Sequence, residues 1–289
     1  MDYVAPPKLL EEVAAAGEKK ARLGLAAMLL KGFLSGALLA YATAFAWRSA
    51  EGLAGGAASL VAAAVFPVGF AMIVLLGLEL VTGNFAVVPV ALARGRGSLP
   101  ALARNWLWVF IGNFLGSIFV GALLAFALTE GFHQAAGPLG DKIIAVARAK
   151  TLAYEHVGAA GWATAFVKAV LCNWMVAMGT VLGMSSNSTV GKIAAIWLPI
   201  MTFFGLQLEH SVVNMFVIPT AMLLGADISV AQWWLWNQIP VTLGNMVGGA
   251  LLTGLLLHFI DRSSKTPAPI AAQTARPAEP DAVPVSGRL

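Results

Sequence analysis

The fold is decided by the stretch Gly205-Leu206-Gln207-Leu208-Glu209-His210-Ser211-Val212-Val213-Asn214-Met215. It places an acid, an imidazole and an amide within six residues, and segments 193–208 and 211–226 around it carry no charged side chain. An ionisable group in so apolar a region is costly unless it is paired or hydrogen-bonded. Glu209 and His210 therefore need buried partners, a function, or both.

The composition is that of an integral membrane protein. Of the 289 residues, 59% are hydrophobic and 11% are charged, whereas soluble domains are about 25% charged. The net charge of +4 is too small to indicate a nucleic-acid partner. Cys172 is the only cysteine, so no intramolecular disulfide or thiol-rich metal site is expected. We also find no catalytic motif, metal-ligand cluster or phosphate-binding loop, and expect neither an enzyme nor a cofactor.

Six apolar segments are long enough to span a membrane, which takes about 20 residues. They cover residues 31–50, 60–92, 105–129, 162–184, 192–223 and 232–260. The second and fifth are too long for simple spans and carry polar residues at their middle. We expect both of these helices to be broken near the centre.

The chain divides into three parts. Residues 1–30 are expected to include a short cytoplasmic amphipathic helix, lying on the membrane surface or packed on a neighbour. Residues 31–261 form the membrane domain, and the Pro- and Ala-rich residues 262–289 are predicted to be a disordered cytoplasmic tail. Most Lys and Arg residues outside the spans fall on one side of six crossings, which predicts cytoplasmic termini. The connection between the third and fourth spans, with Lys142, Arg148 and Lys150, is the exception.

The two halves of the chain repeat. Glu79, Asn84 and Pro89 recur as Glu209, Asn214 and Pro219, 130 residues later. Two weaker matches follow the same order: Gly112-Asn113-x-x-Gly116 with Gly244-Asn245-x-x-Gly248, and Lys31, Leu34 and Ala40 with Lys168, Leu171 and Ala177. Three spans in each half place the halves in opposite orientations, which predicts a 3+3 inverted repeat with its site at the interface near the midplane.

The repeat separates structural from functional candidates. The matched Glu and Asn residues suit a shared task, satisfying backbone groups freed where a helix breaks. His210 does not follow the repeat, since its counterpart is Leu80. It is either a hydrogen-bonded structural histidine or, as we favour, a group that offers charge or a proton inside a dry site. Thr82 lies on the first break, where its hydroxyl serves either the same site or its own helix backbone.

Four motifs together resemble the formate/nitrite transporter family. They are Leu78-Glu79-Leu80-Val81-Thr82-Gly83-Asn84, Leu171-Cys172-Asn173-Trp174-Met175-Val176, Leu208-Glu209-His210-Ser211-Val212-Val213-Asn214-Met215 and Ile239-Pro240-Val241-Thr242-Leu243-Gly244-Asn245. The resemblance covers about residues 8–260. It implies an aquaporin-like, all-α fold of six transmembrane helices in the plasma (bacterial inner) membrane. It also implies a homopentamer with one pore per protomer, and formate, nitrite or related monovalent anions as substrates.

The resemblance also assigns pore residues. His210 would be the central pore histidine, with Thr82, Asn173 and Glu209 in its polar network. Two constrictions are implied, and their residues are Phe66 and Phe203 at one and Phe70, Val81 and Val176 at the other. A phenylalanine is more usual at Val81 and a leucine at Phe70, so the second constriction is expected to differ in shape. The Cys172-Asn173-Trp174 run is slightly nearer nitrite-type members.

The sequence therefore predicts transport of nitrite or formate, made pH-dependent or proton-coupled by His210. One alternative is a channel for water or small neutral solutes. Its usual Asn-Pro-Ala pair is absent, since the breaks read Asn84-Phe85-Ala86 and Asn214-Met215-Phe216. A receptor or scaffold is the third alternative, but it would not need a midplane histidine.

Overall fold

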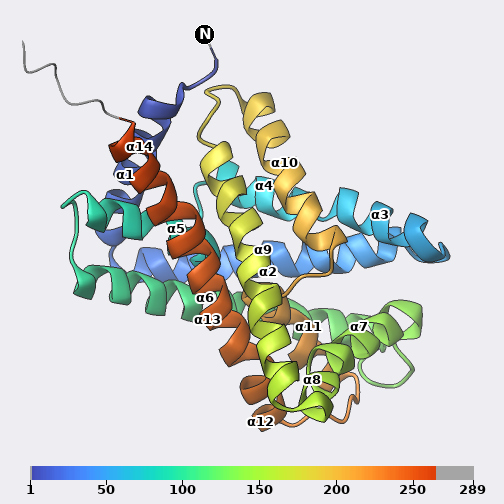
Figure 1. Ribbon diagram of the computed structural model, residues 1–289. Coiled ribbons are helices and arrows are strands. Elements are labelled where there is room, and N and C mark those ends of the chain that lie inside the picture. The colour runs from blue at the N-terminus through green and yellow to red at the C-terminus, as the bar shows by residue number, and fades with distance from the viewer. Residues whose placement is uncertain (1, 265–289) are drawn as a thin grey trace, which may run out of the picture.

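A computed structural model describes residues 2–264, and within them the chain is almost entirely helical (Figure 1). The single isolated bridge joins Tyr3 and Ser186, and no strand forms in the described residues. The all-α prediction is confirmed. The predicted tail lies, from residue 265 onward, outside the described residues.

Helices account for each predicted span. In chain order they are α2 (Leu25–Ser49); α3 (Gly55–Val65), α4 (Pro67–Leu75) and α5 (Val81–Ala93); α6 (Leu99–Leu128); α9 (Ala159–Leu182); α10 (Thr189–Gly205) and α11 (Ser211–Leu223); and the run α12 (Val230–Trp233), η1 (Trp234–Gln238), α13 (Ile239–Gly249), η2 (Ala250–Leu255) and α14 (Leu256–Ser263). Among the described residues, five continuous helical runs are long and apolar enough to cross a membrane. The second and fifth predicted spans are each interrupted, as expected, before α5 and before α11.

Some predicted boundaries were wrong. The first helix begins at Leu25, six residues earlier than predicted, and the second begins at Gly55. The connection between the third and fourth spans contains two helices, α7 (Gly137–Lys150) and α8 (Leu152–Val157). Positive charges within α7 made this segment resemble a loop, although it packs against α11.

Both breaks begin with the same helix C-cap. In α4, Leu78 N–H donates to Ile73 O at 3.0 Å and Gly77 N–H to Val74 O at 3.1 Å. In α10, Leu208 N–H donates to Phe203 O at 3.2 Å and Gln207 N–H to Phe204 O at 3.0 Å. This Schellman pattern requires a left-handed residue after the helix end.

The left-handed residues of the two caps differ. They are Gly77, with φ 62°, and Gln207, with φ 53°. A side-chain-bearing residue in that region costs about 1 kcal/mol relative to its preferred conformation. The second break therefore carries a strain that the first does not.

After each cap the chain is extended, and one asparagine at each break forms hydrogen bonds with the backbone of these extended residues. Asn113 of α6 accepts from Val81 N–H at 2.9 Å and donates to Glu79 O at 2.9 Å. Asn245 of α13 accepts from Ser211 N–H at 2.9 Å and donates to Glu209 O at 3.0 Å. Backbone groups freed by the breaks are thus satisfied inside the protein, as a membrane interior requires.

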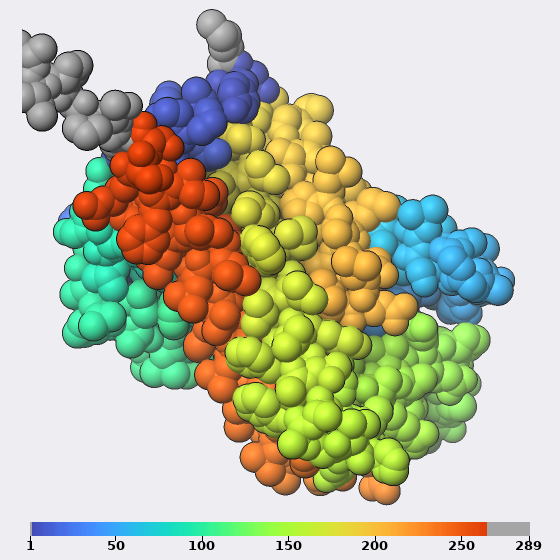
Figure 2. Space-filling model, viewed as in Figure 1, coloured from blue at the N-terminus to red at the C-terminus, as the bar shows by residue number. Residues whose placement is uncertain are grey.

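Close helix crossings position these asparagines. The helix α2 packs along α6, and α9 packs along α13, the second pair lying side by side on the face shown in Figure 2. A Cβ on Gly116 would collide with the Phe33 carbonyl, and one on Gly248 with the Val170 carbonyl. Small residues at such crossings let the backbones approach. The matched Gly-Asn motifs thus bring each asparagine to its break.

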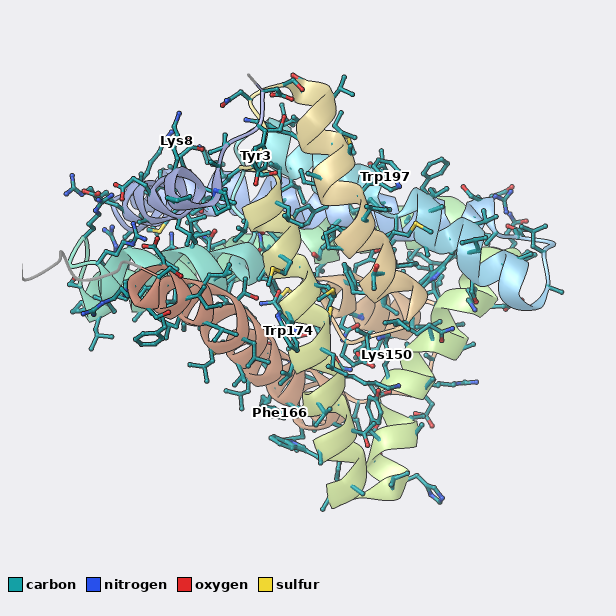
Figure 3. All side chains as sticks on the ribbon, turned by 45° about the horizontal axis from the view of Figure 1, so that its top comes forward. Tyr3, Lys8, Lys150, Phe166, Trp174 and Trp197 are labelled. Atoms are coloured by element: carbon teal, nitrogen blue, oxygen red, sulfur yellow. The ribbon has the colours of Figure 1, made fainter. Side chains whose placement is uncertain are left out.

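The N-terminal helix α1 (Pro6–Ala21) packs on α5 and buries Val13 and Ala14 against the valines of that helix. The residues before it are tied to the loop between α9 and α10, near Tyr3 in Figure 3. Asp2 accepts hydrogen bonds from Ser186 Oγ at 2.9 Å and from the backbone N–H groups of Asn187 and Ser188 at 2.8 and 2.6 Å. These bonds, chiefly those from the Ser186 hydroxyl, hold the pKa of the Asp2 carboxyl below its usual value.

Candidate functional site

His210 closes the fifth-span break and starts α11. Its Nδ1 accepts a hydrogen bond from Val213 N–H at 3.2 Å, so the ring is the N-cap of α11. Its Nε2 lies 3.1 Å from Thr82 Oγ1, at the start of α5. Because Nδ1 accepts, a neutral ring carries its hydrogen on Nε2 and donates it to Thr82. The two breaks therefore meet at one His–Thr contact, and His210 is only 2% exposed.

Asn173 of α9 supports this contact from the side. Its Nδ2 donates to Thr82 O at 3.0 Å and to Asn245 O at 2.6 Å. Its Oδ1 is fully buried and has no hydrogen-bond partner among the described residues. Asn173 is thus brought next to the His–Thr contact, with one acceptor unused.

Each break carries a buried ion pair. Glu209 lies 2.7 Å from Lys150 Nζ and accepts from Tyr154 OH at 2.7 Å and Asn214 Nδ2 at 2.8 Å. Lys150 ends α7 (Figure 3). A buried carboxylate with a bonded ammonium brings no net charge to its surroundings. Glu209 therefore adds little net negative charge beside His210.

The first half repeats this arrangement at its own break. Glu79 lies 2.9 Å from Lys20 Nζ and accepts from Asn84 Nδ2 at 2.7 Å. Asn84 also donates to Asn105 Oδ1 at 2.9 Å, as Asn214 does to Asn237 Oδ1 at 2.8 Å.

Sequence reasoning missed Lys20 and Lys150, yet they too are 130 residues apart, as are Glu79 and Glu209. Comparing charged residues outside the spans at the repeat offset would have found both lysines.

Two cavities approach the His–Thr contact from opposite breaks. The larger, which we call the α7 cavity, has a volume of about 400 Å³ and is bordered by His210, Lys168, Gln207 and Phe203. The smaller, the α1 cavity, has a volume of about 210 Å³ and is bordered by Leu80, Lys31 and Phe70. The counterparts His210 and Leu80 therefore border different cavities, whereas Thr82 is fully buried and borders neither.

The predicted constriction residues are all buried, in two distinct settings. Phe66 and Phe203 contact edge to face, with ring centroids 5.5 Å apart, and Phe203 stacks on the His210 ring at 5.6 Å. Val81 and Val176 belong to the hydrophobic core and border neither of the two cavities, whereas Phe70 borders the α1 cavity. The structure thus brings Phe203 directly to His210 and Phe66 behind Phe203.

The described residues contain no group of three or more His, Cys, Asp or Glu side chains that could hold a metal ion. The chemistry available at the contact is therefore hydrogen bonding and proton exchange by an imidazole and a hydroxyl.

Comparison with known proteins agrees with this geometry. The formate/nitrite transporter family model matches residues 7–259. The chain is 37% identical to a probable formate transporter of Methanothermobacter thermautotrophicus, over 89% of this chain and 97% of that protein. It is 32% identical to the formate channel FocA of Haemophilus influenzae, over 81% and 86%.

Two solved structures share the fold. One is described as an FNT family ion channel, with a TM-score of 0.74 at 23% identity over 87% of this chain and 98% of that one. The other is described as a pentameric formate channel with formate bound, with a TM-score of 0.68 at 26% identity over 82% and 97%. The chain therefore belongs to the formate/nitrite transporter family, whose members are membrane channels and transporters rather than enzymes.

Proposed function

We propose that this protein carries formate, and also nitrite, across the plasma membrane through a pathway in each protomer of a homopentamer. Formate is proposed as the main substrate because two relatives have formate in their names. The homopentamer is supported by the solved structure that is described as a pentameric formate channel. Nitrite remains a prediction from the Cys172-Asn173-Trp174 run. The α1 cavity faces the cytoplasm with both termini, in line with the Lys and Arg distribution.

The observation that carries the proposal is the buried contact between His210, which borders the α7 cavity, and Thr82, whose neighbour Gly83 borders the α1 cavity. A bare anion pays a large desolvation cost in a dry gap. Lys168 and Lys31, one at each cavity, offer positive charge that draws the anion in. The remaining barrier is the short segment lined by His210, Thr82 and Phe203.

His210 lowers this barrier through Nε2. In the neutral ring the Nε2 hydrogen can turn from Thr82 to an anion oxygen. Once Nδ1 has taken up a proton from solvent, the charged ring can share its positive charge with the anion or pass the Nε2 proton to it, and the ring is then neutral again. If the proton is passed, formate crosses as the neutral acid and flux follows the proton gradient. Charging the ring also requires Nδ1 to release Val213 N–H, so the protonation state is coupled to the N-cap of α11.

The test is uptake of labelled formate and nitrite, side by side, into proteoliposomes with an imposed pH gradient. We expect uptake of both to rise with an inward proton gradient and formate to be carried faster. Water or glycerol permeation without anion uptake would replace the proposal with a neutral-solute channel. Absence of flux for every solute would favour a receptor or scaffold.

A further inference from the structure

The C-cap of α10 places a residue with a side chain, Gln207, in the left-handed backbone region that favours glycine. Its φ of 53° lies in the left-handed region, where its repeat counterpart is Gly77 with φ 62°. The surrounding hydrogen bonds of the two caps are the same. Glycine would serve this position without strain, as it does in the other half.

No contact among the described residues accounts for the glutamine. Its side chain is exposed, and its carboxamide makes no hydrogen bond within the described part of the chain. A Cβ added to Gly77 would meet nothing within 4 Å. Lack of space therefore does not explain why the first half keeps glycine while the second half carries a strained glutamine.

The side chain instead borders the α7 cavity, together with His210 and Lys168. A carboxamide offers two N–H donors and adds no charge, which suits an oxyanion whose charge is already balanced by a lysine. The two lysines are engaged differently: Lys168 Nζ lies 5.9 Å from the centroid of the Tyr154 ring, whereas Lys31 Nζ, at the α1 cavity, donates a hydrogen bond to Gly77 O at 3.1 Å. The α7 cavity therefore has a carboxamide without a hydrogen-bond partner among the described residues, whereas the α1 cavity has a glycine at the matching position.

The geometry points to Gln207 as a substrate-recognition residue of the α7 cavity. It donates a hydrogen bond to one oxygen of the anion before the anion reaches His210, and this recognition is not repeated at the α1 cavity. The inference rests on the proposed anion transport and names the residue that sets affinity at one mouth. Backbone strain is kept at functional positions of this kind.

The test compares Gln207→Gly, Gln207→Ala and Gln207→Asn in proteoliposomes, with labelled formate uptake measured against concentration. Losing a neutral donor to a charged, partly solvated acceptor should raise KM about 3- to 10-fold in the Gly and Ala variants. The maximal rate should stay within about twofold, because the donor acts on capture rather than on passage. Asn keeps the carboxamide and tolerates the left-handed region, so its KM should stay near that of the unchanged protein.

Gly95→Gln is the matched control, since Gly95 ends α5 in the same kind of cap with φ 73°, a Cβ there would meet nothing within 4 Å, and the residue borders neither cavity. It should leave KM within about twofold. Gln207→Gly should also raise the Tm by about 2–4 °C because it removes the strain, which shows that the variant is folded.

An unchanged KM in a folded Gln207→Gly variant overturns the inference while leaving the transport function in place. A lower maximal rate with unchanged KM overturns it too, since that is the result of a structural role. If the unchanged protein takes up no anion, the proposed function and this inference fall together.

Discussion

The two helix breaks share the same cap, ion pair and asparagines, but different side chains border the cavity beside each break. Each has a Schellman cap, a buried Glu paired with a Lys, an Asn bonded to that Glu, and a second Asn that bonds the backbone around the turn. Among the positions that differ, three of the second half, His210, Gln207 and Tyr154, stand where the first half has Leu80, Gly77 and Gly24. All three replacements border the α7 cavity. The repeated residues therefore build the breaks, and these three side chains distinguish the α7 cavity from the α1 cavity.

Both breaks contain a buried Glu–Lys ion pair, and removing one partner of a pair should have the largest effect on stability. Glu209→Gln leaves the Lys150 ammonium, only 14% exposed, without its carboxylate. Breaking a buried pair costs about 3–5 kcal/mol, so unfolding in detergent, followed by tryptophan fluorescence, should shift to much lower temperature. Glu79→Gln should lower the Tm less than Glu209→Gln, because only the Glu209 variant also loses the charge-assisted hydrogen bond from Tyr154 OH.

The double variant Lys150→Met with Glu209→Gln is the control, because it removes the unpaired ammonium while the glutamine carboxamide can still form hydrogen bonds with Asn214 and Tyr154. It should recover most of the lost stability. Equal Tm values for Glu209→Gln and the unchanged protein would show that the pair does not hold the second break together.

Thr82 tests the contact between the breaks. Thr82→Val removes the hydroxyl 3.1 Å from His210 Nε2 and should cost about 1 kcal/mol, with transport falling about 5- to 10-fold. Thr82→Ser keeps the hydroxyl and should retain most of the rate. Equal rates for the Val and Ser variants, measured by formate uptake, would remove Thr82 from the pathway.

The smallest effect concerns Asp2, which has no counterpart role in the other half. Its pKa is lowered from an ordinary value of 3.8, chiefly by the Ser186 hydroxyl. A lowered pKa means that its contribution is full above the ordinary pKa and is lost as the pH falls through the folded-state value. The amide hydrogens of Asn187 and Ser188 donate to Asp2 and should exchange faster in Asp2→Asn at neutral pH.

That difference in hydrogen exchange should shrink as the pH falls through the lowered pKa of Asp2 and vanish once the carboxyl is protonated in the folded state as well. Faster exchange of the Asp2→Asn variant that persisted at low pH would mean that the carboxylate charge is not what holds the N-terminal segment.

Much of the fold could be predicted because its main determinants are local or periodic. Apolar length gave the spans, and the recurrence of Glu79 and Asn84 as Glu209 and Asn214 gave the breaks. The helix α7 was missed because its positive charges outweigh its short apolar face. The π-helical turns at η1 and η2 could not be predicted from the sequence, because they shift the helical register inside a mostly apolar segment.

The candidate site was predictable only in part. A histidine without a repeat counterpart singled out His210, but its capping bond to Val213 and its contact with Thr82 depend on how the halves fold together. The strain at Gln207 depends on a backbone angle that no residue pattern reveals, although its mismatch with Gly77 was visible. The partners of Glu209 were hidden because Lys150 lies 59 residues away, in a segment interpreted as a connection.

The most direct test of the central claim is the pH profile of formate uptake by the His210→Asn variant. Asparagine is a good N-cap and should preserve the start of α11, while it removes the only titratable group at the contact. We predict a folded protein whose uptake is at least about tenfold slower and no longer rises with an inward proton gradient. Full uptake with an unchanged pH profile would contradict the assignment of His210 as the group that carries the anion across the gap.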